Sequence, residues 1–448
     1  MRKGSEPRPH HTHTAIHMPI PWKNLCGEGE CPAIEASLKE KTALVGRVGF
    51  LLLSAGSGAW RVRDMMNHAA EALHVVCSAD IGLTNINLTC FDESGNCSIA
   101  LSLRTTGINT DRLMAISEFI RHFSGRISTV SIKTLHEELD AIDEKPGHYQ
   151  PWNLGLAAGL ACGAFTFLLG GGLIEMVCAF LGAGLGNYLR MKMLHRHIAL
   201  FACVAASVAA ACGTYVAAMS LAEWLFHFSE VHEAGYICAM LFIIPGFPII
   251  TGGMDIAKLD MRSGIERILY GLMIIVIATL TGLVMAMLLG FQPGELKREA
   301  LHPWIVIILK SVMSFFGVYG FSLMFNSSRK MAATAGFIGM IANTARLLLI
   351  EEIGAHYFVA AFLGALTAGL IASFTKKRTG YPRMSLTVPS VVIMVPGLYM
   401  YRAIYNIGLG DIALGSDWLA RACLIVFALP MGLVLSRLLT DSKFRHCI

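Results

Sequence analysis

The sequence predicts a mainly α-helical, polytopic membrane protein: about ten transmembrane helices, forming two five-helix inverted repeats, follow an N-terminal α+β domain. Three observations predict this class: composition, a succession of apolar segments, and a faint internal repeat. Hydrophobic residues make up 54% of the 448 positions and charged residues 15%, whereas soluble domains carry roughly a quarter charged residues. Such a chain cannot cover a water-facing surface, which excludes a soluble enzyme and a disordered scaffold. The net charge of +5 is not gathered into a basic patch, so no nucleic-acid partner is expected.

Residues 1–32 are predicted to be a disordered leader, because they are rich in His and Pro and lack the apolar core of a signal peptide. Metal binding by this leader is the alternative. It would use Cys26 and Cys31 together with His10, His11, His13 and His17. The cysteine spacing matches no zinc motif, so we expect no metal site.

Residues 33–150 are predicted to form a cytoplasmic α+β domain. Helical spacing covers 38–53, 61–73, 111–123 and 131–142, while two strands, 84–90 and 97–103, are joined by a turn at 92–96. Pro146-Gly147 and Pro151 mark the junction with the membrane region.

The remaining chain divides into two membrane modules, 151–290 and 303–440, each with five apolar segments near the ~20 residues that a bilayer requires. The ten predicted spans are 152–170, 172–189, 198–222, 234–253, 264–290, 303–325, 331–350, 354–374, 388–407 and 418–439. One set of alternating loops holds 15 Lys and Arg residues and the opposite set holds 2. This bias predicts that the basic side, both termini and the α+β domain face the cytoplasm.

The internal repeat consists of three short matches in the same order. Residues 164–167 match 320–323 at an offset of 156, residues 180–182 match 337–339 at 157, and residues 244–246 match 395–397 at 151. An odd number of spans in each half forces the halves into opposite orientations, which is the plan of many secondary transporters. Chance similarity between apolar segments is the alternative.

Two proline–glycine pairs interrupt matching spans of the two halves. Pro245-Gly246, followed by Pro248, lies near the middle of the fourth span, and Pro396-Gly397 lies near the middle of the ninth. Proline removes a backbone donor and glycine lets the helix unwind. Paired breaks of this kind indicate a transport site in which the amides of a half-helix hold an anion. A kink tolerated by neighbouring helices is the alternative.

Cationic and polar side chains at membrane depth add to this site. Lys310 lies in the sixth span, and Asn343 precedes Arg346 by one turn on the same face of the seventh. Arginine offers a two-pronged match to a carboxylate, although Arg346 could also reach the headgroups. Tyr401, in the polar end of the ninth span, suits a cavity wall or an interfacial belt.

Carboxylates at membrane depth are candidates for proton coupling, because a buried acid is costly unless it has a function. Asp255, after the first break, is the better candidate, and Glu175 lies near one end of the second span. Asp260 and Asp411 are interpreted as solvated loop acids.

An intramembrane aspartyl protease is an alternative function, because Gly408-Leu409-Gly410-Asp411 fits the Gly-x-Gly-Asp signature of these enzymes. Such an enzyme needs two facing acids. The charge bias places Asp411 outside and Asp255 inside, so we expect no enzymatic activity.

The chain resembles the threonine/serine exporter family from about Ala43 to Arg437. The resemblance rests on several segments: 54–62 (SAGSGAWRV), 104–107 (RTTG), 244–250 (IPGFPII) with Asp255, 325–329 (FNSSR), 339–346 (GMIANTAR) and 395–397 (VPG). It implies proton-motive export of small hydroxy amino acids from the bacterial inner membrane without a prosthetic group. Some bacteria carry the two modules on separate chains, and one such pair is linked to succinate export, so a dicarboxylate exporter remains the alternative.

The sequence thus predicts a secondary active exporter of threonine or serine, working by alternating access with lipid, substrate and protons as its partners. Intramembrane proteolysis and a passive channel are the remaining alternatives, and the sequence leaves open whether copies of the chain associate. The candidate substrate-binding residues are Pro245, Gly246, Pro248, Lys310, Asn343, Arg346, Pro396, Gly397 and Tyr401, and the proton-coupling candidates are Asp255 and Glu175.

Overall fold

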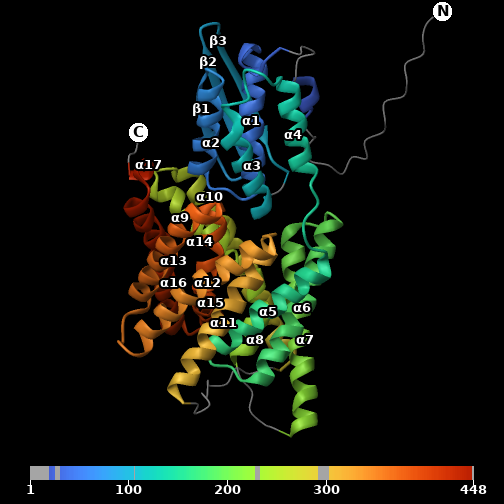
Figure 1. Cartoon of the computed structure of the whole chain (residues 1–448). Coiled ribbons are helices and arrows are strands. Elements are labelled where there is room, and N and C mark those ends of the chain that lie inside the picture. Colours follow the sequence, from blue (N-terminus) through green and yellow to red (C-terminus); the bar gives the residue numbers. More distant parts are fainter. Residues whose placement is uncertain (1–19, 26–30, 105, 228–232, 291–301, 446–448) are drawn as a thin grey trace, which may run out of the picture.

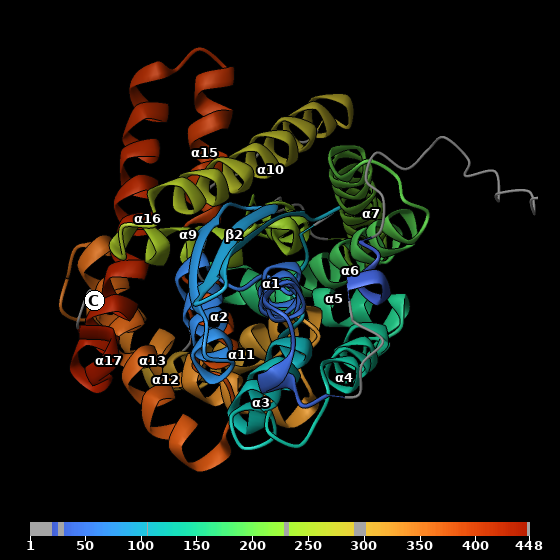
Figure 2. The same cartoon turned by 90° about the horizontal axis from the view of Figure 1, so that it is seen from above.

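The computed structural model describes residues 20–25, 31–104, 106–227, 233–290 and 302–445. A bundle of long helices forms most of the molecule, and a smaller α+β unit covers one end of it (Figure 1). Seen from above, the α+β unit lies over the centre of the bundle (Figure 2).

The α+β unit has a three-stranded antiparallel sheet in the order β1-β2-β3. Its elements are α1 (Leu38–Ser54), α2 (Ala59–Ala72), β1 (Val76–Ile81), β2 (Asn85–Asp92), β3 (Gly95–Ser102), α3 (Thr110–Phe123) and α4 (Ile132–Glu144). The four predicted helices and the β2–β3 hairpin are present. β1 was not predicted, because apolar Val76 lies on its exposed side, where it is 69% exposed, and most of its other residues are small or polar, with weak strand propensity.

Part of the predicted leader belongs to this unit. Residues Trp22–Leu25 form a short 3-10 helix, in which the Trp22 ring lies 5.8 Å from that of Phe50. The guanidinium of Arg47, on α1, lies 5.4 Å from the Trp22 ring centre. His10, His11, His13, His17 and Cys26 lie outside the described residues.

The two halves of the membrane region show the same succession of elements: three helices, a bent pair and a long helix. The first half contains α5 (Pro151–Leu168), α6 (Leu173–His195), α7 (Leu200–Phe226), α8 (Glu233–Met240) with the 3-10 turn η3 (Leu241–Ile243), α9 (Gly246–Ala257) and α10 (Met261–Leu288). The second contains α11 (Pro303–Met324), α12 (Arg329–Glu351), α13 (Tyr357–Thr379), α14 (Arg383–Val392), α15 (Gly397–Gly408) and α16 (Ile412–Thr440), followed by α17 (Ser442–Arg445).

Among the described residues, seven helices are long and apolar enough to cross a membrane, and the two bent pairs raise the number to nine. Ten spans were predicted. The difference is α6, which has the length of a span but carries Glu175, Arg190 and Lys192 within its 23 residues.

Corresponding helices of the two halves run in opposite directions relative to the α+β unit. α10 begins beside this unit, where Arg262 pairs with Asp80, whereas α16 ends beside it, where Arg437 lies over the Trp60 ring. Likewise α5 begins and α11 ends near the unit, and the two helices pack closely at Gly320 (Figure 1). These directions support the proposal of two inverted repeats.

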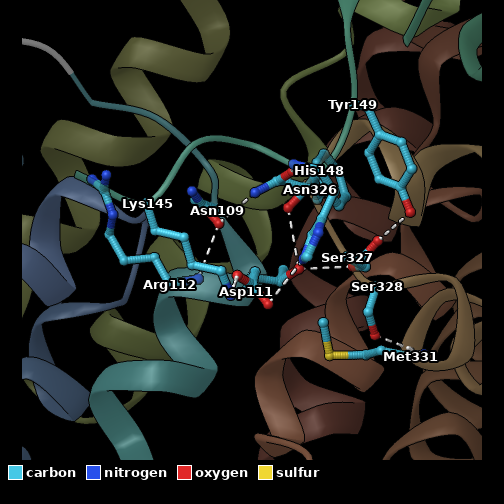
Figure 3. A network of polar contacts seen from close by, with 12 residues as sticks. Asn109, Asp111, Arg112, Lys145, His148, Tyr149, Asn326, Ser327, Ser328 and Met331 are labelled. Carbon is cyan, nitrogen blue, oxygen red and sulfur yellow. Dashed lines mark hydrogen bonds and ion pairs between the residues drawn. The ribbon is translucent and has the colours of Figure 1, made fainter. Parts of the chain in front are cut away.

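The α+β unit is attached to both halves. On the second half, the Phe325 carbonyl accepts from the Thr110 amide at 3.0 Å, and the Asn326 amide donates to Asn109 Oδ1 at 2.9 Å. The hydroxyl of Tyr149 donates to the Ser327 carbonyl at 2.8 Å (Figure 3). The FNSSR segment at 325–329 therefore has a docking role in this structure.

On the first half, the attachment is a buried carboxylate. Asp255 Oδ2 accepts from the amide of Ala59, at the start of α2, at 3.0 Å. A β-carbon added at Gly58 would lie 2.7 Å from Asp255 Oδ1, so glycine permits this close approach. The GSGAW segment at 56–60 therefore brings a helix N-terminus onto a membrane-region acid.

Candidate functional site

The two proline–glycine breaks have the same backbone geometry. Pro245 has φ −81° and ψ 54°, and Pro396 has φ −79° and ψ 53°. In both, the following glycine amide donates to the carbonyl two residues earlier at 2.8 Å, which closes an inverse γ-turn. The helices bend by 64° at the first break and by 47° at the second. The predicted interruptions are thus present in the structure, in matching form.

The breaks also pack against each other. A β-carbon at Gly246 would lie 3.2 Å from a methyl of Val392 and 3.3 Å from one of Val395, whereas a β-carbon at Gly397 would overlap the end of Ile244. Each glycine therefore faces the residues that precede the opposite break. Because neither position has room for a larger side chain, glycine allows the two segments to meet.

A small, mainly apolar pocket lies at this meeting point. Its polar groups are the hydroxyls of Thr279 and Tyr401, and it is also lined by Gly397 and Ile244. The half-helices α9 and α15 begin here, and neither receives a side-chain cap from the described residues. Helix starts of this kind leave amides for an anion.

Arg346 lies beside the second break, on a different side of α15 from this pocket. Its Nε donates to Asn343 Oδ1 at 3.0 Å, and Asn343 in turn donates to Ser314 Oγ at 2.8 Å. It interacts electrostatically with Tyr399, two residues after Gly397. The hydrogen bonds orient Arg346, and its terminal nitrogens make no ion pair or hydrogen bond with the described residues.

Lys310 is placed differently from the sequence expectation of a shared cationic site. Its ammonium pairs with Glu351, at the end of α12, and Lys310 does not line the pocket at the breaks. The structure therefore brings Asn343 and Arg346 together, and Glu351, the partner of Lys310, is also an electrostatic neighbour of Arg346.

The two proton-coupling candidates are both buried. Asp255, 2% exposed, has its Oδ2 at 3.0 Å from Ser263 Oγ and 3.3 Å from Arg267 Nε. Glu175 accepts from the Gly172 amide at 2.7 Å at the start of α6, and it interacts electrostatically with Tyr215.

The two loop acids differ from each other. Asp411 is exposed and accepts from the Leu414 amide at 3.0 Å, which caps α16. The interpretation of Asp260 as a solvated acid was wrong: its side chain is 9% exposed and pairs with Arg63 at 2.6 Å. The docked α+β unit supplies this arginine, which a reading of the membrane loops alone does not reveal.

Sequence reasoning missed a cluster of arginines where the α+β unit meets the bundle. Arg267, Arg383 and Arg437 are all buried, although the charge count used them only to orient the chain. A signal was present in the sequence, because these arginines lie near the ends of three predicted spans. Local spacing, however, does not show that they converge.

Two family models match the chain. Residues 43–290 match one described as "Putative threonine/serine exporter", and residues 310–439 match "Threonine/Serine exporter, ThrE". A relative from Mycobacterium tuberculosis, named "Probable threonine/serine exporter", is 24% identical over 88% of this chain and 75% of its own length.

Relatives named "Probable succinate transporter subunit YjjP" match a shorter part. The protein from Klebsiella aerogenes is 28% identical over 55% of this chain and 92% of its own length. The one from Escherichia coli is 26% identical over 55% of this chain and 93% of its own length. No solved structure matches the chain.

Proposed function

Because the chain belongs to the threonine/serine exporter family, we propose that it is a secondary active exporter of threonine or serine. The modules 151–290 and 303–440 move against each other to expose the site to alternate sides. The observation that carries the proposal is the contact between the two broken spans, each closed by the same proline turn. Interrupted helices that meet between repeats are the usual site of substrate in such transporters.

The substrate carboxylate is assigned to the start of α15 and to Arg346. The half-helix presents amides and the positive end of its dipole, while Arg346, held by Asn343, presents terminal nitrogens that bind none of the described residues. The hydroxyls of Tyr401 and Thr279, with Gly397 between the helices, are suited to the polar remainder of a hydroxy amino acid.

The choice between an amino acid and a dicarboxylate as substrate depends on the positive charge available near Arg346. A second cation beside Arg346 would favour a dicarboxylate, but Lys310 is paired with Glu351. Glu351 is also an electrostatic neighbour of Arg346, so the two cations share one carboxylate, and their net charge of +1 fits a molecule with one carboxylate. The names of the YjjP relatives keep a succinate-like substrate as the second candidate.

We further propose that export is driven by protons, with Asp255 and Glu175 as the titrating groups, in a bacterial inner membrane with the α+β unit and both termini in the cytoplasm. The two acids are buried in different parts of the first half, and the basic loops lie on the side of the α+β unit. A carboxylate that gains and loses a proton as the halves move would link flux to the gradient.

Substrate choice is tested by counterflow in proteoliposomes with labelled threonine, competed by serine and by succinate. We expect serine to compete and succinate to leave uptake unchanged; the reverse result would establish the dicarboxylate alternative. Arg346→Gln should reduce counterflow at least tenfold, while Arg196→Gln, at an exposed arginine after α6, should keep it. Equal activity of the two variants would remove Arg346 from the site.

Coupling is tested separately from binding. Asp255→Asn and Glu175→Gln should each weaken flux driven by a pH gradient more than counterflow, which needs no gradient. If gradient-driven flux and counterflow fall equally, that residue is not the coupling group. Asp411→Asn should leave transport intact, whereas a protease would lose its activity with this change.

A further inference from the structure

A second pocket lies where the α+β unit meets the bundle, and it shares no lining residue with the pocket at the proline breaks. It is enclosed by α2, α9, α14, α16 and α17, and the free space inside it is small. We call it the basic pocket. Its lining includes Trp60, Arg61, Asp255, Lys258, Arg383, Arg437 and Phe444.

The charges that line the basic pocket do not balance. Four side chains are cationic, and Asp255 is its one lining carboxylate. Asp255 is already engaged, because it pairs with Arg267 and accepts hydrogen bonds from Ser263 and the Ala59 amide. The described residues that line the pocket therefore supply no further counter-ion for its positive charge, which is costly at a buried site unless something else supplies negative charge.

Arg437 is the clearest case. It is 8% exposed, and its guanidinium lies beside an edge-to-face pair of aromatic rings, 4.7 Å from the centre of Trp60 and 5.0 Å from that of Phe444. The guanidinium forms no hydrogen bond or ion pair with the part of the chain that the structure describes. Its electrostatic neighbours include Asp441 and Asp64, but neither comes within ion-pair distance. These cation–π contacts hold the guanidinium without using its N–H donors.

The neighbouring cations are also held in place by neutral groups. Arg383 donates to Ser436 Oγ at 2.9 Å, to the Gly369 carbonyl at 3.1 Å and to Thr440 Oγ1 at 3.0 Å. Arg61 donates to Ser117 Oγ at 2.8 Å, and its buried Nε has no partner. These contacts orient the arginines without neutralising them.

We propose that the basic pocket is a binding site for a compact oxyanion, a phosphate or carboxylate group with no cation of its own nearby. Arginine forks match such groups with paired, charge-assisted hydrogen bonds. A zwitterionic amino acid fits poorly, because the carboxylate that its ammonium would need is taken by Arg267. The pocket is thus distinct from the proposed substrate site at the breaks, although Asp255, a proposed coupling group, lines it.

Binding at this position has a structural consequence. α2 is fixed to the first half through Asp255, whereas Arg383 and Arg437 belong to the second half. An anion between Arg61 and these arginines links the two halves through the α+β unit. The bound anion therefore stabilises the relative arrangement of the two halves that is seen in this structure.

The test uses the full chain purified in a neutral detergent, with thermal unfolding followed at constant ionic strength. Inorganic phosphate and succinate are titrated against chloride. We expect at least one oxyanion to raise the midpoint of unfolding saturably, and Arg437→Gln to weaken its apparent affinity at least tenfold. Arg437→Lys should weaken it less, because the charge stays. Arg378→Gln, at an exposed arginine, is the matched control and should bind as the unchanged protein does.

A lipid headgroup is the other source of the same chemistry. In nanodiscs, phosphatidylglycerol is compared with phosphatidylcholine, and stabilisation by the anionic lipid that Arg437→Gln abolishes would identify a headgroup as the ligand. The proposal is overturned if neither free anion nor anionic lipid stabilises the protein beyond chloride. It is also overturned if Arg437→Gln and Arg378→Gln respond alike. Threonine counterflow is measured on the same samples, so that a failure of the transport proposal is seen independently.

Discussion

Replacing Asp255 by alanine should weaken the attachment of the α+β unit to the first half of the bundle. The substitution removes the acceptor of the Ala59 amide and of Ser263 Oγ, each at 3.0 Å, and the partner of Arg267 at 3.3 Å. Both members of the ion pair are almost fully buried. Breaking such a pair costs about 3–5 kcal/mol, because the remaining charge stays in a medium of low polarity.

The size of this loss is limited by what remains around Arg267. It still donates to the Ser57 carbonyl at 2.6 Å and to Ser263 Oγ at 3.1 Å. We therefore expect the lower end of the range, about 3 kcal/mol, for Asp255→Ala. Replacing both partners with apolar residues, as Asp255→Leu with Arg267→Met, should recover much of the loss, since no charge is then left without a counter-ion.

The assay is thermal unfolding in detergent combined with limited digestion of the linker before α5 by a protease of broad specificity. Asp255→Ala should lower the unfolding midpoint by several degrees and speed the release of the α+β unit. Asp64→Ala, at a half-exposed acid of α2, is the matched control and should change neither readout. A loss below about 0.5 kcal/mol, the usual range of surface changes, would refute the account of Asp255 as a buried anchor.

Three further predictions follow from the packing and from one buried histidine. Gly397→Leu should push the two breaks apart and abolish counterflow while the protein still inserts; unchanged counterflow would show that their contact is dispensable. Gly320→Leu should cost roughly 1–3 kcal/mol in a thermal scan, because even a β-carbon there would lie 2.6 Å from the Ala157 carbonyl oxygen. Burial, followed by the charge of Arg47, lowers the pKa of His136 from 6.5 to about 4. Because the unfolded histidine binds a proton that the folded one does not, stability is complete above pH 6.5 and about 3 kcal/mol is lost as the pH falls to 4. His136→Gln should flatten this slope, and an unaltered slope would contradict the assignment.

Much of the fold could be predicted because it depends on local sequence. Composition and apolar length indicated the membrane helices, and the proline–glycine pairs marked both breaks within a residue or two. Helical spacing and a turn signal located most of the α+β unit. β1 was missed for a local reason too, because its exposed face carries Val76.

The candidate site was predictable only in part. Asn343 and Arg346 share one face of a single helix, so their contact follows from spacing. Lys310, on α11, was expected beside them, and in the structure it pairs with Glu351 at the end of α12. Which group of α12 lies next to Lys310 is decided only by the way in which α11 and α12 pack.

By itself, the sequence determined that the chain is a membrane protein, where its helices break, and which loops are basic, since each of these properties resides in neighbouring residues. Only the tertiary structure decided that the α2 start rests on Asp255, that Asp260 is paired with Arg63, and that Arg437 enters a pocket with Arg61 and Arg383. These groups lie up to several hundred positions apart. Their meeting depends on how separate helices and the α+β unit pack, which no local periodicity encodes.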